Sequence, residues 1–141
     1  MKKIVKFIAI AVVGFGFVAC SSDDDAAPVS PMEGTWVAKT ISYDAGAHSG
    51  TYPFDHEIFK KGCATDYLTL TADQKASLKE NNKNEADVCV DQISNGTWTT
   101  AKVTINGVDR AVKSSSATEL VLVYPINFMG QTLDVDVLYT K

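Results

Sequence analysis

The sequence predicts a small all-β domain, an antiparallel up-and-down β-barrel of about eight strands. From Met32 onward, apolar and polar residues alternate with a period near two, the spacing of a strand with one buried face. Gly, Asn and Ser residues typical of turns interrupt this pattern at short intervals. No stretch shows the periodicity of a long helix. Sequential hairpins form a meander, and closure into a barrel removes exposed sheet edges; a β-sandwich is the alternative.

The first half of this domain contains few clear strands. Strands are predicted at 34–43 and at 66–70, where apolar residues alternate with Thr and other polar residues. Residues 76–79 show a weak strand pattern, but 73–80 also hold good helix formers, so a short helix is the alternative there. Residues 80–87 are charged and rich in Asn, which indicates a loop.

The second half is a more regular series of hairpins. Asn106-Gly107 is the strongest two-residue hairpin signal in the chain, because both residues tolerate positive φ. Near the C-terminus, Asp134 and Asp136 alternate with apolar residues, the pattern of a half-buried antiparallel strand. The strands predicted in this half are 96–100, 102–105, 108–112, 119–124 and 132–139, with a connection over 125–131.

Residues 1–19 have the three parts of an export signal: a basic start, an apolar run and a small-residue end. The apolar run, 7–18, is shorter than the roughly 20 residues that span a membrane. Val18-Ala19-Cys20 forms a lipobox, and the segment resembles bacterial lipoprotein signals. The resemblance implies cleavage before Cys20 and lipid on its thiol. An ordinary cleaved signal followed by a fortuitous cysteine is the alternative.

Residues 20–31 predict a tether between this lipid and the folded domain, 32–141. The segment is mostly Ser, Asp, Ala and Pro without periodicity, so it has nothing to form a core. Its acidic triplet, 23–25, resembles the surface-export signal of Bacteroidota lipoproteins. That resemblance implies attachment to the outer membrane with the protein facing outward; a solubilising linker is the alternative.

Charge excludes nucleic acid as a partner. The part after the signal holds all seventeen acidic residues but only ten of the thirteen basic ones, a formal net charge of −7. Beyond the pair Lys60-Lys61 it has no basic cluster, so it lacks the electrostatic footprint of a nucleic-acid-binding surface.

The cysteine count points to one disulfide. With Cys20 assigned to lipid, Cys63 and Cys89 remain as a pair in an oxidising compartment. Two free buried thiols or a redox pair are the alternatives, although the chain has no Cys-x-x-Cys. Two cysteines alone do not complete a structural zinc site.

Several of these features together resemble the lipocalin-like domains of Bacteroidota lipoproteins. Gly34-Thr35-Trp36 matches the Gly-x-Trp opening of lipocalins and related calycins, and Gly96-Thr97-Trp98 repeats it. The cysteine spacing and the closing strands agree with the same likeness, which covers 32–141. It implies a barrel with Trp36 packed across one end, and we separately expect the protein to be a monomer. No second or third lipocalin motif is recognisable, and the barrel is short, which argues against a roomy cup.

The sequence contains no recognisable set of catalytic residues. The chain has no Gly-x-Ser-x-Gly, no phosphate loop, no His-Glu-x-x-His and no cofactor fingerprint, so we predict neither enzyme activity nor a cofactor. His48 with Asp55-His56-Glu57 has the donor types for a divalent metal, but an ordinary polar loop is the better interpretation, and no metal is predicted. Asp134 and Asp136 should lie on a solvated outer face, where carboxyls make poor general acids.

Segment 44–62 is the strongest candidate for contacts with a ligand or partner. It is longer than most connections in compact domains and shows no clear periodicity. In calycins, the corresponding loop covers the open end of the barrel. The leading hypothesis is a binding module for a small apolar or amphipathic ligand; the second is a solid barrel that presents this segment to a surface protein. Core packing of the same aromatics, with a short helix at 55–61, is the structural alternative. The candidate contact residues are Tyr52, Phe54, His56 and Phe59.

Overall fold

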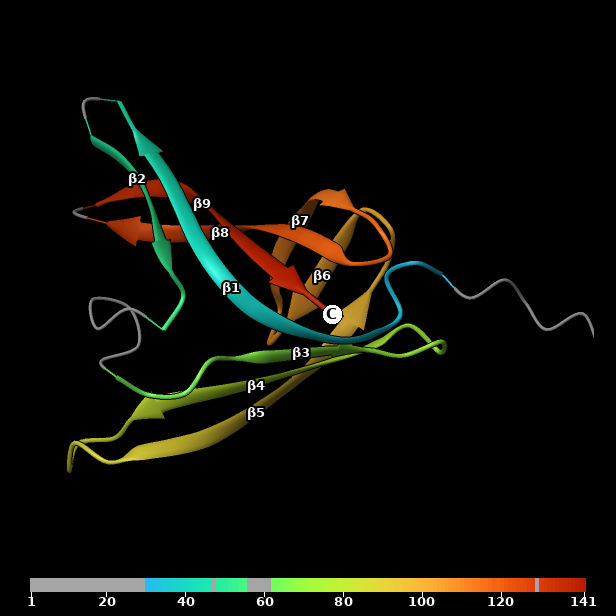
Figure 1. The fold of residues 1–141 in the computed structure, drawn as a ribbon, viewed down its shortest axis with the longest axis horizontal. Coiled ribbons are helices and arrows are strands. Elements are labelled where there is room, and N and C mark those ends of the chain that lie inside the picture. Colours follow the sequence, from blue (N-terminus) through green and yellow to red (C-terminus); the bar gives the residue numbers. More distant parts are fainter. Residues whose placement is uncertain (1–29, 47, 56–61, 129) are drawn as a thin grey trace, which may run out of the picture.

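The computed structural model describes residues 30–46, 48–55, 62–128 and 130–141, and these form one antiparallel sheet of nine strands (Figure 1). None of the described residues lies in a helix, so none of them forms a membrane-spanning helix. The strands are β1 (Gly34–Ala45), β2 (His48–Pro53), β3 (Tyr67–Leu70), β4 (Lys75–Lys83), β5 (Cys89–Trp98), β6 (Lys102–Ile105), β7 (Val108–Ser115), β8 (Glu119–Phe128) and β9 (Gln131–Thr140).

Eight of these strands close into an up-and-down barrel, as the sequence predicts. From β3 to β9 each strand pairs with the next in sequence, and β1 completes the ring by pairing with both β3 and β9. The β1–β9 seam runs from Val37 opposite Thr140 to Tyr43 opposite Val135, with a bulge between Ala38 and Thr40. A β-sandwich is therefore excluded, because one continuous sheet curls onto itself.

The ninth strand, β2, corrects the prediction that 44–62 lacks regular structure. It forms a hairpin with β1, from Ala45 opposite His48 to Thr40 opposite Pro53. Its sequence carries few apolar residues because β2 lies at an edge of the sheet, where backbone pairing to β1 is enough to hold it. Figure 1 shows this hairpin extending toward the same side as the β4–β5 and β8–β9 hairpins.

The long β4–β5 hairpin corrects two further predictions. Residues 75–83 are strand, so neither the short helix over 73–80 nor a loop beginning at residue 80 is present. Likewise β5 begins at Cys89 rather than at residue 96, and β8 continues through most of the connection predicted at 125–131. The parts of β4, β5 and β8 that the sequence did not predict extend beyond the buried core, toward one end of the barrel. Inward positions there do not have to be apolar, so the alternating pattern is lost.

One end of the barrel is closed by its own side chains. The turns after β3, β5 and β7 lie at this closed end, together with the start of β1 and the end of β9. Trp36 is fully buried, and its indole Nε1 donates a hydrogen bond to the Met32 carbonyl at 2.8 Å. From the other terminus, the Lys141 ammonium lies 4.3 Å from the centre of the Trp36 ring and donates to the Pro31 carbonyl at 2.9 Å. Both ends of the domain thus cover Trp36, which matches the role that the resemblance implies.

Candidate functional site

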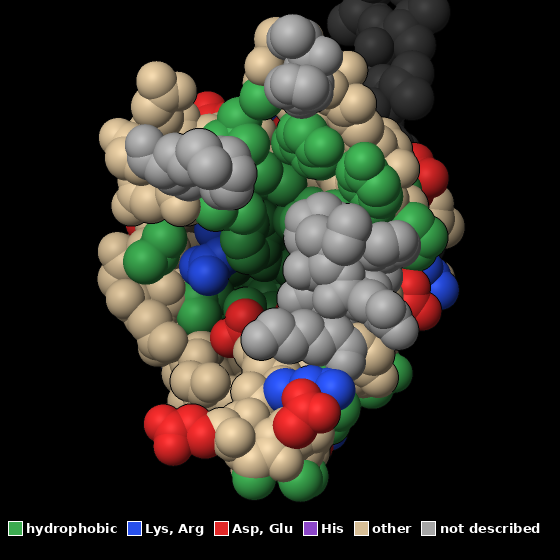
Figure 2. All heavy atoms as spheres, turned by 90° about the vertical axis from the view of Figure 1, so that its left-hand side faces the viewer, with side chains coloured by type: hydrophobic (Ala, Val, Ile, Leu, Met, Phe, Trp, Pro, Cys, Tyr) green, Lys and Arg blue, Asp and Glu red, His purple; other side chains and the backbone are tan. Residues whose placement is uncertain are grey.

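The opposite end of the barrel is open and hollowed. The turns that follow β1, β4, β6 and β8 lie at this open end. Figure 2 views the molecule from the side to which the β1–β2, β4–β5 and β8–β9 hairpins extend in Figure 1, and it shows a hollow lined by hydrophobic side chains. Acidic and basic groups are exposed on the walls of the hollow. This hollow is the candidate site.

Aromatic and aliphatic side chains from non-adjacent parts of the chain meet at this end. Tyr43 of β1 and Tyr52 of β2 stack with parallel rings, their centres 6.0 Å apart. Phe54, Tyr124 of β8 and Leu133 of β9 are also only partly buried and pack against the core. Strand alternation explains the positions of Tyr43, Tyr124 and Leu133, because each lies two residues from a buried core residue of its own strand. The hollow therefore has an apolar lining that is incompletely covered.

An apolar rim, formed by Val88, Val90, Val108 and Ile126, lies at the same end. These four are among the six large hydrophobic residues of the described chain that stand exposed, between 39% and 55%. Val90 and Ile126 share strand faces with buried Ser94 and Leu122, and Val108 is paired with buried Ile105, so these three are inward positions. Apolar side chains facing the mouth of a barrel without burial indicate a surface suited to an apolar partner.

A layer of polar groups lies deeper in the barrel. The hydroxyls of Tyr124 and Tyr139 share a hydrogen bond of 2.5 Å, and Tyr139 is 1% exposed. The guanidinium carbon of Arg110 lies 4.6 Å from the centre of the Tyr124 ring. Asp66, 3% exposed, accepts a hydrogen bond from the Asn81 backbone N–H at 3.1 Å. Sequence reasoning missed this layer, although Arg110 sits at an inward position of an alternating strand.

Burial keeps both tyrosines of this layer protonated. Desolvation raises the pKa of Tyr139 well above its ordinary value, and the neighbouring Tyr124 raises it further. Burial also raises the pKa of Tyr124, against the opposing effects of its hydrogen bond to Tyr139 and of the Arg110 charge. The two hydroxyls are thus a neutral hydrogen-bonding pair at physiological pH.

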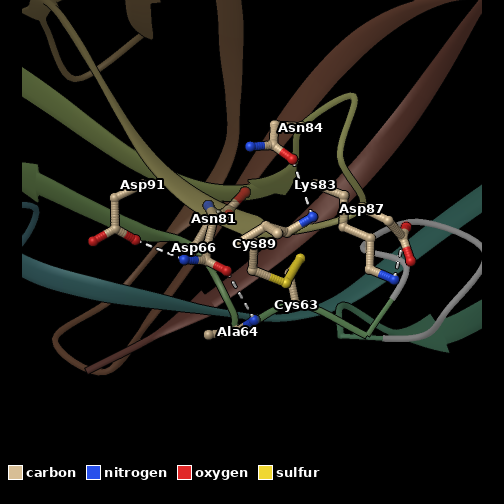
Figure 3. The surroundings of a disulfide bond; sticks show 10 residues. Cys63, Ala64, Asp66, Asn81, Lys83, Asn84, Asp87, Cys89 and Asp91 are labelled. Atoms are coloured by element: carbon tan, nitrogen blue, oxygen red, sulfur yellow. Dashed lines mark hydrogen bonds and ion pairs between the residues drawn. A yellow bond between two sulfur atoms is a disulfide. The ribbon is translucent and has the colours of Figure 1, made fainter.

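The Cys63–Cys89 disulfide forms at one wall of the open end (Figure 3). It joins the segment before β3 to the first residue of β5, with the two Cα atoms 5.7 Å apart. The Ala64 N–H also donates to the Asn81 side-chain oxygen at 3.2 Å, and the Asn81 amide donates to Asp91 at 2.6 Å. Closing this loop removes about 3.5 kcal/mol of unfolded-chain entropy. The bond fastens the short wall strand β3 to the projecting hairpin and excludes the free-thiol alternative.

The sequence-predicted contact residues lie only partly within the described chain. Tyr52 and Phe54 both pack against the core at the open end, whereas His56 and Phe59 lie outside the described residues. Of the four members of the metal alternative, His48 begins β2 and Asp55 is exposed in the turn after it, whereas His56 and Glu57 lie outside the described residues. Within the described ranges no three His, Cys, Asp or Glu side chains cluster as metal ligands would. Asp136, on the outer face of β9, forms an ion pair with Lys113 of β7.

The four barrel-signature residues lie at or near the closed end, away from the hollow. Trp98 repeats the arrangement of Trp36: it is 5% exposed, and its Nε1 donates to the Thr71 carbonyl at 2.9 Å. Gly34 has φ +126°, a conformation that favours glycine. A Cβ on Gly96 would lie 1.7 Å from the Thr104 carbonyl oxygen, so β5 and β6 pass too closely for any side chain there. These residues shape the barrel and do not line the site.

Comparison with known proteins agrees with this architecture. No protein-family model and no curated protein sequence matches the chain. Among solved structures, the bovine lipocalin allergen Bos d 2 aligns over 80% of this chain and 75% of its own, with a TM-score of 0.50 and 12% identity. A bovine odorant-binding protein, a deswapped triple mutant, aligns over 79% of this chain and 74% of its own, with a TM-score of 0.50 and 16% identity.

A lipocalin-like protein from Bacteroides uniformis aligns over 79% of this chain and 99% of its own, with a TM-score of 0.47 and 10% identity. The two bovine structures support the fold of this chain, each with a TM-score of 0.50. From its strand order, its closure and these two likenesses, the chain has the lipocalin fold.

Proposed function

We propose that the protein is a binding module that holds a small apolar or amphipathic molecule in the hollow at its open end. The observation that carries this proposal is the apolar rim above a partly covered apolar lining. Ligand sites are typically concave and mostly apolar, with a few polar groups that orient the ligand. The odorant-binding protein among the structural neighbours is named for binding small molecules, which supports the same role here.

Covering the exposed apolar rim with a ligand would contribute favourable binding free energy. Covering apolar surface contributes roughly 25 cal/mol per Å². At the closed end, Met32 and Trp36 already cover the core, so nothing is gained there. At the open end the exposed rim is available to a ligand of suitable length. The proposal assigns no catalytic residue and no cofactor, and we expect the module to act as a monomer.

Titration with the neutral fluorescent probe N-phenyl-1-naphthylamine tests this role. The wild-type protein should raise the probe's fluorescence in a saturable way. Leu133→Trp places a large ring where a partly buried side chain packs beside the hollow, and should weaken probe binding about tenfold, a change of about 1.4 kcal/mol.

The matched control is Asp134→Trp, which adds the same ring to the exposed outer face of β9. It should bind the probe like the wild type. A wild-type protein that leaves the probe's fluorescence unchanged would contradict the proposal and would favour the alternative, a solid barrel that contacts a surface protein through segment 44–62.

We further propose that the module is held at a membrane by lipid on Cys20, with 21–31 as the tether, and that this membrane is the outer membrane. The lipobox Val18-Ala19-Cys20 supports this proposal. Each buried methylene of an acyl chain contributes about 0.8 kcal/mol, and two chains give stable anchoring.

Metabolic labelling with palmitate tests the anchor. The wild-type chain should incorporate label and fractionate with membranes, while Cys20→Ala should do neither. Ser21→Ala, which leaves the thiol in place, serves as the control and should label normally. Label on the Cys20→Ala chain would show that the lipid site lies elsewhere.

A further inference from the structure

We propose that the hollow receives an anionic amphiphile head-first, with the acidic head group of the ligand on Arg110 and its apolar tail against the apolar rim. The inference rests on the proposed binding function and names the class of ligand. Three observations carry it: the unmatched donor on Arg110, the satisfied state of the polar groups around it, and their depth below the rim.

Arg110 has a hydrogen-bond donor without an acceptor. Its Nη1 donates to the carbonyls of Val108 at 3.1 Å and Ile105 at 3.5 Å, which fixes one edge of the guanidinium on the β6–β7 hairpin. Its Nε is buried, and it is the one buried side-chain nitrogen or oxygen in the described chain that finds no partner. A buried N–H without an acceptor destabilises the unliganded protein, so an acceptor brought by a ligand is favoured.

The neighbouring polar groups are already engaged. The hydroxyls of Tyr124 and Tyr139 bond to each other, and the Tyr124 ring lies under the guanidinium. Two carboxylates, Asp66 and Glu80, act electrostatically on Tyr124 from the same region. Asp66 accepts from the Asn81 N–H, and both carboxylates have further interactions of their own. Arg110 is therefore the side chain of this layer whose hydrogen-bond donors are not all used, and it can donate to a ligand.

Depth sets the direction of the ligand. The guanidinium of Arg110 reaches back to the Val108 carbonyl and lies over the ring of Tyr124, and Tyr124 is two residues below Ile126 along β8. At about 3.3 Å per residue, the backbone of Tyr124 lies about 7 Å deeper along β8 than that of Ile126. A polar head placed there leaves an attached chain to run outward past the exposed rim residues. The reverse direction would put an apolar tail on Arg110 and leave its donor unmatched.

An acidic head group fits this donor best. Hydrogen bonds between a guanidinium and a carboxylate or phosphate are charge-assisted and roughly twice as strong as neutral ones, and the planar fork of arginine matches two acceptor oxygens. Arg110 is half-buried as a residue, so part of its side chain is reachable while Nε is covered.

Displacement of N-phenyl-1-naphthylamine by three twelve-carbon amphiphiles below their micelle concentrations tests the inference: dodecanoate, dodecanol and dodecyltrimethylammonium. Dodecanoate should bind the wild type at least about tenfold more tightly than dodecanol, and the cation should bind weakest. Equal binding of dodecanoate and dodecanol, or a preference for the cation, would overturn the inference. Failure of the neutral probe itself to bind would instead overturn the proposed function.

Variants locate the head group. Arg110→Gln should lose the preference for dodecanoate while it keeps its affinity for dodecanol within about threefold, and Arg110→Lys, which keeps the charge but lacks Nε, should recover only part of the preference. Lys113→Gln removes a cation from the outer side of the same strand and should change nothing. An unaltered preference in Arg110→Gln would overturn the assignment. The wild-type head-group series remains decisive if that variant fails to fold.

Discussion

Replacement of Gly96 by alanine is expected to destabilise the barrel by about 3 kcal/mol or more, at or above the upper end of ordinary core overpacking. The added methyl carbon would lie 1.7 Å from the Thr104 carbonyl oxygen and 2.8 Å from its carbonyl carbon. Both atoms belong to the backbone, so no rotamer change relieves the overlap. Strands β5 and β6 would have to separate, which would break the pairing of Gly96 with Ile105.

Urea denaturation followed by tryptophan fluorescence measures this loss. Thr97→Ala is the matched control, because the next residue of the same strand is exposed and its truncation should cost less than about 0.5 kcal/mol. A Gly96→Ala protein as stable as the control would mean that β5 and β6 are farther apart in solution than in this structure.

Trp36→Ala is the second large effect, with an expected loss of about 3–5 kcal/mol. The substitution removes a fully buried indole, its hydrogen bond to the Met32 carbonyl and the ring beneath the Lys141 ammonium. The closed end would then lose the side chain that joins the two termini of the domain. Thermal unfolding should show a decrease of roughly 10 °C or more in Tm.

Two variants separate the contributions to this effect. Trp36→Phe keeps an aromatic ring but leaves the Met32 carbonyl without its donor, so its stability should lie between wild type and Trp36→Ala. Val37→Ala, on the opposite face of β1 and only half-buried, should cost less than Trp36→Phe. If Trp36→Ala were no more damaging than Val37→Ala, the closed end would not depend on this ring.

The strands were predicted best where the alternation of apolar and polar side chains is enough to identify them. In the second half, alternation marks β9, and the two-residue turn forms as expected, with φ of 50° at Asn106 and 77° at Gly107. β2 and the far part of β4 escaped prediction because backbone pairing with a neighbour, rather than an apolar face, makes them strands. Such pairing depends on residues distant in sequence and leaves little trace in local composition.

The same reasoning explains what was found of the site. Tyr52 and Phe54 could be named because aromatic residues in a long connection are conspicuous, and the structure places both against the core at the open end. Arg110, Asp66 and Tyr139 were not predicted as site residues, because each is unremarkable within its own segment. They become one layer only when β1 pairs with β9 and closes the ring, which decides which face of every strand is inside.

The segment that covers the closed end also determines where the chain enters the barrel. Met32 is buried beside Trp36, and the Ser30 N–H bonds to the Glu33 side chain just before β1, so Ser30 lies at the end of the barrel opposite the mouth. With the lipid on Cys20 that we propose, the tether would join the domain at its closed end, and the mouth would lie at the end of the barrel farthest from that point of attachment. The tether would then leave the mouth uncovered, and a ligand could enter and leave the hollow without passing the anchored end.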